Sequence, residues 1–176
     1  MNHILRLIKT LLFSRFKSKC PVFGPCRTKF RVLPTDLDVL LHMNNGKYLS
    51  LMDLGRVDMM IRSGFFKKIN ANGWYPVVAE QTIQYLRSLQ PFQSFEIVTK
   101  VIGMDDKALL VSQDFESKGK IYARAVVRAR FLKKSGGKVL TQELLDLAQE
   151  EPDFSKSPDW VQRWNDDMKA LRTPKR

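Results

Sequence analysis

Residues 44–64, which read NNGKYLSLMDLGRVDMMIRSG, form an apolar-periodic run that is long enough for a helix of several turns. Apolar residues occupy most of the helical circumference, so this helix must be covered on most sides and is expected at the centre of the fold. Asn44 or Asn45 can cap its start, and Gly64 is expected to end it. The broad apolar face consists of Tyr48, Leu51, Met52, Leu54, Gly55, Met59 and Ile61.

Four runs typical of β-strands follow this helix, separated by turn signals. They cover residues 75–89, 92–104, 107–117 and 120–134, and a shorter strand is expected at 26–33. The last run alternates clearly, and small residues on one face suit the close approach of a helix. We therefore predict an α+β fold in which one buried helix packs against one curved antiparallel sheet. The two faces of the last run are Arg124, Val126, Arg128 and Arg130, and Ala123, Ala125, Val127, Ala129 and Phe131.

The length of 176 residues favours a single domain with terminal additions. We divide the chain into a basic amphipathic segment at 1–24, the helix-and-sheet domain at 25–135, and a helical extension at 136–176. Helices are expected near residues 141–151 and 157–171. The last helix has an apolar stripe that is expected to dock on the domain or on a neighbouring subunit: Trp160, Val161, Trp164, Met168 and Leu171.

The formal net charge of +12 is concentrated near the N-terminus, because no acid precedes Asp36. The first 19 residues have near-helical apolar spacing with bases between them, which fits a helix on an anionic membrane surface. A helix packed on its own domain or on a partner subunit, or a solvated basic arm, would also fit. Nucleic-acid binding is disfavoured, because the strands do not interleave bases with aromatics. The eight early bases are Arg6, Lys9, Arg15, Lys17, Lys19, Arg27, Lys29 and Arg31.

Cys20 and Cys26 are the only cysteines, and their spacing matches neither a redox pair nor a zinc half-site. Free thiols in a reducing compartment are expected, so we predict a cytoplasmic location, peripheral to a membrane. With His3 and His42 as the only histidines, no metal site is expected and no cofactor is predicted.

The stretch before the central helix, PTDLDVLLHMNNGKYL at residues 34–49, combines carboxylates with a helix start. A helix N-terminus offers unpaired backbone N–H groups and partial positive charge, which can stabilise a developing oxyanion. Gly46 would let a carbonyl oxygen approach the backbone closely. Asp38 lies far enough ahead to fold back over the helix start, where its carboxylate would act as base or nucleophile, or would interact only with loop amides or the helix dipole. The apolar residues 39–41 are expected to pack the loop over the helix start.

Residues 27–134 resemble the hotdog-fold thioesterases of the 4-hydroxybenzoyl-CoA thioesterase type. Among them, the chain resembles the thioesterase superfamily member six-like proteins, whose LPxDLDxLLHMNN form it shares. Leu41 stands where the family often has glycine. The resemblance implies a helix wrapped by an antiparallel sheet, subunits joined edge to edge in a homodimer or dimer of dimers, and acyl-CoA bound at the interface. It also implies that Asp38 matches the catalytic aspartate and that Asn45 or Gly46 supplies the oxyanion N–H.

Other residues are assigned secondary roles. His42 would orient Asp38 or contact the substrate, or be a buried structural histidine. Asp36 is expected to cap the loop or form an ion pair. Asp53 is the second candidate base, although it and Asp58 would alternatively pair with Arg56 or Arg62. Substrate binding is assigned to Asn44 and Tyr48, and binding of the CoA phosphates to Arg87 and Arg128, with Arg124 and Arg130 as further candidates.

The leading prediction is therefore an acyl-CoA thioesterase that releases free acid and CoA. The main alternative is a non-catalytic hotdog protein that binds acyl groups or acyl-CoA at a membrane surface. A hotdog dehydratase ranks low, because the context of His42 does not match that chemistry.

Overall fold

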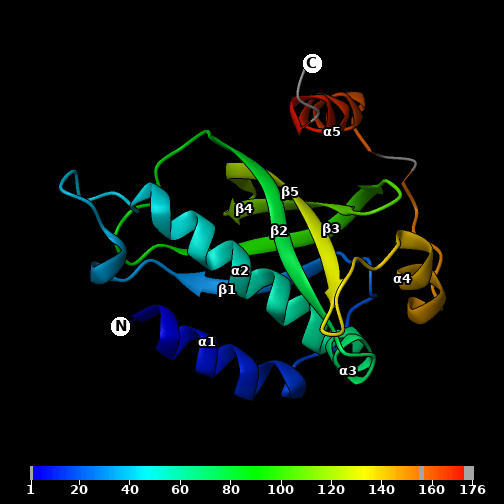
Figure 1. Ribbon diagram of the computed structural model, residues 1–176. Helices are drawn as coiled ribbons and strands as arrows, with labels where there is room; N and C mark the ends of the chain where they lie inside the picture. The colour runs from blue at the N-terminus through cyan, green and yellow to red at the C-terminus, as the bar shows by residue number, and fades with distance from the viewer. Residues whose placement is uncertain (1, 155–156, 173–176) are drawn as a thin grey trace.

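A computed structural model describes residues 2–154 and 157–172 and shows one long helix, α2 (Asn45–Arg62), crossing one face of a five-stranded antiparallel sheet (Figure 1). This confirms the predicted α+β architecture. The sheet order is β1-β3-β4-β5-β2. The strands are β1 (Cys26–Arg31), β2 (Trp74–Tyr85), β3 (Ser94–Met104), β4 (Leu109–Ser117) and β5 (Lys120–Lys133).

Strand β2 does not pair with β3, the strand that follows it in the sequence, but with β5, where Gln81 lies opposite Val127. The sheet therefore has β1 at one edge and β2 at the other. Between α2 and β2 the chain forms a further helix, α3 (Phe65–Ala71), which the sequence patterns did not indicate. Gly64 has a φ of 73° and separates the two helices, which confirms it as the end of α2.

Helix α2 approaches the sheet closely at Gly55, and small residues of β5 lie in the same core. Ala123 and Ala125 of β5 are buried in the core, as their alternation predicted. On the helix side, a Cβ at Gly55 would meet Gln113 Nε2 at 3.1 Å and Thr99 Oγ1 at 3.2 Å. Gly55 is thus an interior helix glycine kept by close packing, despite the cost of glycine in a helix.

The N-terminal helix α1 (Asn2–Phe13) and the short helix η1 (Ser14–Phe16) pack on α2, so the expectation of a helix on its own domain is met. Their anchor is Asp58 of α2, which is fully buried. Burial opposes ionisation of this carboxylate, but its hydrogen bonds outweigh burial and lower its pKa. The donors are Ser14 at 2.5 Å, Thr28 at 2.7 Å, Lys17 at 2.8 Å and Arg62 at 3.1 Å.

The C-terminal extension contains α4 (Thr141–Ala148) and α5 (Asp159–Arg172). Helix α5 packs Val161 and Trp164 on the sheet face opposite α2. This agrees with the prediction that the apolar stripe of the last helix docks on the domain. Trp160 and Leu171 of the same stripe are exposed. The apolar cluster under α5 is formed with Ile102, Leu110 and Val126.

Candidate functional site

Asp38 lies in the loop before α2, and its carboxylate is held by the loop's own backbone. Asp38 Oδ1 accepts hydrogen bonds from the N–H groups of Leu40 at 2.9 Å and His42 at 3.3 Å. The Asp38 N–H in turn donates to the His42 carbonyl at 2.9 Å, which closes the loop. In the described part of the chain, no donor reaches Asp38 Oδ2. The loop therefore orients the carboxylate through one oxygen and leaves the other open.

Asp36 is structural, as predicted, and only 1% of its surface is exposed. Its Oδ2 accepts from the Leu33 N–H at 2.9 Å and from Arg6 Nη2 at 2.7 Å. Its backbone carbonyl accepts from the Asn44 N–H at 2.8 Å, which ties the loop to the start of α2. Its pairing with Arg6, 30 residues earlier on α1, carries no local sequence signal.

The backbone N–H groups of Asn45 and Gly46, the two candidate oxyanion donors, have different hydrogen bonding at the start of α2. Asn44 is the N-cap, and its Oδ1 accepts from the Gly46 N–H at 2.9 Å. The Gly46 donor is therefore already engaged. The Asn45 N–H has no acceptor in residues 2–154 and 157–172, as expected at the first position of a helix. Asn45 is thus the open donor, and Asn44 serves as a cap.

The expectation that residues 39–41 pack the loop over the helix start is wrong. Val39 is 96% exposed, and Leu40 and Leu41 are also exposed. The backbone bonds around Asp38 turn these side chains outward. Leu41 has a φ of 58°, a left-handed conformation that favours glycine. Glycine would adopt this backbone conformation at lower cost.

His42 and Tyr48 lie in environments that differ from those expected for their predicted roles. His42 bonds Asp38 through its backbone, and its ring has no hydrogen-bond partner in the part of the chain that the structure describes. Tyr48 is buried in the core, with its ring centroid 5.1 Å from that of Tyr85, and this position favours packing over substrate contact. The Tyr85 hydroxyl donates to the Asn45 carbonyl at 3.4 Å. No local signal marked Tyr85, because strand β2 meets the helix start only in the fold.

The two arginines assigned to the CoA phosphates have different environments. Arg87 is exposed and donates to the Ile121 carbonyl at 2.6 Å. Arg128 is 1% exposed, which argues against its predicted phosphate contact. Helix α5 covers the face of β5 that bears Arg128, and internal acceptors engage its guanidinium: Asp105 at 2.5 Å, Asn165 at 2.7 Å and Glu80 at 3.4 Å.

An apolar cavity of about 260 Å³ lies between α2 and the sheet. Asp53, Pro76 and Val78 are its exposed lining residues, so the cavity opens between α2 and the free strand β2. Asp53 forms an ion pair with Arg56, which was the predicted alternative to a catalytic role for Asp53. Arg56 also donates to Gln113 Oε1 at 2.5 Å. The second candidate base is therefore already paired where it lies at the mouth of this cavity.

Residues 32–165 match the family model of the thioesterase-like superfamily. The chain belongs to this superfamily. It is 38% identical over 135 residues to Protein THEM6 of Xenopus laevis, which covers 76% of this chain and 63% of that protein. The chain therefore matches less than two thirds of the length of that relative.

Solved thioesterase structures share the superfamily's fold with this chain, which confirms the predicted hotdog fold. YbaW, a probable thioesterase from Escherichia coli, superposes with a TM-score of 0.65 at 25% identity, over 69% of this chain and 94% of its own. A gentisyl-coenzyme A thioesterase superposes with a TM-score of 0.62 at 17% identity, over 69% of this chain and 99% of its own.

The superfamily match begins after strand β1. Asp36, Asp38 and the start of α2 lie inside it, whereas α1 and β1 lie outside it. Arg6, which binds the signature residue Asp36, is therefore contributed by a segment beyond the match.

Proposed function

We propose that this chain is an acyl-CoA thioesterase that hydrolyses an acyl-CoA thioester to a free acid and CoA. The observation that carries the proposal is that the loop before α2 holds an oriented carboxylate and the start of α2 has an open backbone donor. Asp38 Oδ2 and the Asn45 N–H are both unengaged in the described residues, and the Asp36 carbonyl ties the loop to the helix start through the Asn44 N–H. Thioester hydrolysis needs one group of each kind.

The chemistry can follow two routes from this arrangement. Asp38 Oδ2 can attack the thioester carbonyl, so that the C–S bond breaks, CoA leaves as thiolate, and water hydrolyses the resulting anhydride. Alternatively, Asp38 removes a proton from a water molecule that attacks the same carbon, and the C–S bond again breaks to release CoA as thiolate. In both routes the carbonyl oxygen becomes negatively charged, and the Asn45 N–H at the positive end of α2 would stabilise it.

A second copy of the chain belongs to this proposal. Strand β2 is a free edge 12 residues long. A long, apolar free edge is a template for pairing with another strand. Pairing of two β2 strands would join the sheets edge to edge and cover the mouth of the apolar cavity, which would hold the acyl group. The exposed side chains that favour such a contact are Tyr75, Val78, Tyr85 and the adjacent Leu86. Sedimentation velocity tests this assembly, and a monomer at assay concentrations would contradict it.

Release of free thiol from acyl-CoAs of different chain lengths tests the activity. Asp38→Asn is expected to lower kcat/KM by about a hundredfold or more, because the substitution removes the base or nucleophile. Asp53→Asn is the matched control and should keep most of the activity. Equal rates for Asp38→Asn and the unmodified protein would exclude Asp38 as the catalyst, and a loss confined to Asp53→Asn would move the site to the helix.

The second candidate function is a non-catalytic acyl-binding protein at a membrane surface. The observation in its favour is the exposed apolar side chains of α1, which accompany the basic residues of 1–19. Within the described residues, no helix is long and apolar enough to cross a bilayer. Saturable acyl-CoA binding without thiol release would favour this function. Failure to sediment with anionic vesicles would remove the membrane surface as a partner.

A further inference from the structure

Helix α1 docks on α2 with polar residues and Leu7, and turns most of its apolar residues to solvent. Thr10 and Ser14 are buried at the contact, and Arg6 reaches Asp36. Figure 1 shows α1 running alongside α2 at the outside of the molecule. An apolar helix face without cover marks a binding surface. The exposed apolar residues of α1 and η1 are Ile4, Leu5, Ile8, Leu11, Leu12, Phe13 and Phe16.

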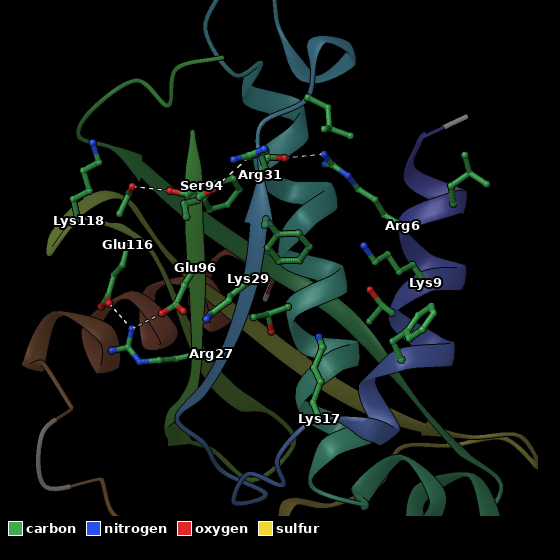
Figure 2. Close-up of a pocket in the computed structure, with 18 of the residues that line it drawn as sticks. Arg6, Lys9, Lys17, Arg27, Lys29, Arg31, Ser94, Glu96, Glu116 and Lys118 are labelled. Atoms are coloured by element: carbon green, nitrogen blue, oxygen red, sulfur yellow. Dashed lines mark hydrogen bonds and ion pairs between the residues drawn. The ribbon is translucent and has the colours of Figure 1, made fainter. Parts of the chain in front are cut away.

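A groove of about 960 Å³ adjoins this apolar surface at the edge strand β1. Leu5 and Phe13 belong to both, so the two features are continuous. Figure 2 shows basic side chains on both sides of β1: Arg6 and Lys9 on the α1 side, and a second group on the sheet side. The second group consists of Arg27, Lys29, Arg31 and Lys118.

The cations of the groove fall into two classes. Arg6, Lys17 and Arg27 are neutralised by carboxylates, with Arg27 bonding both Glu96 and Glu116. Arg27 therefore pairs with both acids that line the groove. The remaining four cations have no carboxylate partner in residues 2–154 and 157–172, although Arg31 bonds the Ser94 hydroxyl at 3.4 Å. They are Lys9, Lys29, Arg31 and Lys118.

We propose that the groove between α1 and β1 binds the phosphate headgroups of an anionic phospholipid membrane while the apolar residues of α1 enter the acyl region. Unpaired cations beside an exposed apolar helix face match the charge and polarity of such a surface. A second copy of the chain fits less well, because a symmetric contact would bring the same unpaired cations together. The inference rests on the proposed membrane role, and it assigns that role to residues of β1 and of the β4–β5 turn, outside residues 1–19.

Co-sedimentation with phosphatidylcholine vesicles, with and without phosphatidylglycerol, tests the groove. The groove variant is Lys29→Gln/Arg31→Gln/Lys118→Gln. The control variant, Lys67→Gln/Lys134→Gln/Lys138→Gln, removes the same charge from exposed lysines outside the groove. Each cation near an anionic surface strengthens binding about fivefold, so the groove variant should bind on the order of a hundredfold more weakly. The control variant should remain within about threefold of the unmodified protein.

Insertion of α1 is tested separately by Leu12→Glu, at an exposed position where folding should be preserved. This variant should lose binding to the anionic vesicles by about tenfold or more, because a charge would enter the apolar layer. Circular dichroism and urea unfolding of all three variants confirm that each is folded.

Several outcomes would overturn the inference in distinguishable ways. If the unmodified protein binds no vesicle, the membrane role itself fails, whereas thiol release still tests the thioesterase proposal independently. If it binds but the groove and control variants weaken equally, the headgroup site is wrong and the membrane role stands. Equal binding to vesicles without phosphatidylglycerol, or displacement by soluble CoA, would also exclude an anionic headgroup site.

Discussion

The guanidinium of Arg6 on α1 lies 2.7 Å from the buried carboxylate of Asp36 and also donates to the Arg31 carbonyl at 3.1 Å. Asp36 is two residues before Asp38, and its own carbonyl accepts from the N-cap residue Asn44. The N-terminal helix, which lies outside the superfamily match, therefore supports the loop that carries the candidate catalytic carboxylate.

Asp36→Asn is expected to lower the free energy of unfolding by about 2 kcal/mol, because it weakens charge-assisted hydrogen bonds in a buried position. Urea unfolding measures this change. Asp114→Asn is the control, since its pair with Arg124 is partly exposed to solvent and should contribute less than about 1 kcal/mol. Equal losses for the two variants would contradict the anchoring role of Asp36.

Leu41→Gly should leave the chain as stable or more stable, although glycine usually destabilises. Leu41 has a left-handed backbone, which costs an L residue about 1–2 kcal/mol, and its side chain is exposed. Leu40→Gly is the comparison, because Leu40 is equally exposed but lacks a positive φ; it should lose about 0.5–1 kcal/mol. Thermal unfolding of both variants checks the difference, and a similar decrease in both would refute strain at Leu41.

Gly55→Val should reduce stability by about 1–3 kcal/mol, because any Cβ at this position meets Gln113 and Thr99 at 3.1–3.2 Å. Ser50→Val introduces the same β-branching into α2, where the native side chain bonds only the Gly46 carbonyl in the described structure. It should cost less than about 1 kcal/mol. Chemical denaturation compares the two, and a harmless Gly55→Val would show that α2 does not need its close approach to the sheet.

Stability should fall in acid through Asp105. Burial raises the pKa of this carboxyl, but the Arg128 guanidinium and the Lys107 N–H outweigh burial and lower the pKa to about 2. Because this value lies below the ordinary value of about 3.9 for an unfolded chain, the ionised carboxylate stabilises the folded state above about pH 4. This contribution, about 2 kcal/mol, is lost as the pH falls from about 4 to about 2.

Urea unfolding at pH 7 and pH 3 measures this effect. The stability difference between the unmodified protein and Asp105→Asn should shrink at the lower pH, because the unmodified protein is losing the contribution that the variant lacks. Gly55→Val, which changes no titratable group, should show the same loss at both values. A difference for Asp105→Asn that does not change between pH 7 and pH 3 would contradict the lowered pKa.

Local patterns in the sequence were sufficient to predict most of the elements and the position of the site loop. The helix at 45–62 and the alternation of Ala123 and Ala125 with Arg124 follow from periodicity, because burial on one side requires apolar residues at the period of each element. The structural role of Asp36 was predictable for a similar reason, since a short-range cap depends on the residues next to it. Helix α3 was missed, because a seven-residue helix has too few periods to be recognised.

The sequence by itself therefore determined most of the elements, the superfamily signature and the candidate roles of Asp38 and Asn45. Only the tertiary structure decided that β2 pairs with β5, that Arg128 is enclosed under α5, that Arg6 holds Asp36, and that α1 turns its apolar face outward. The physical reason is that these arrangements join residues far apart in the chain. Their energies depend on which surfaces meet and which charges are buried, and no local spacing records that outcome.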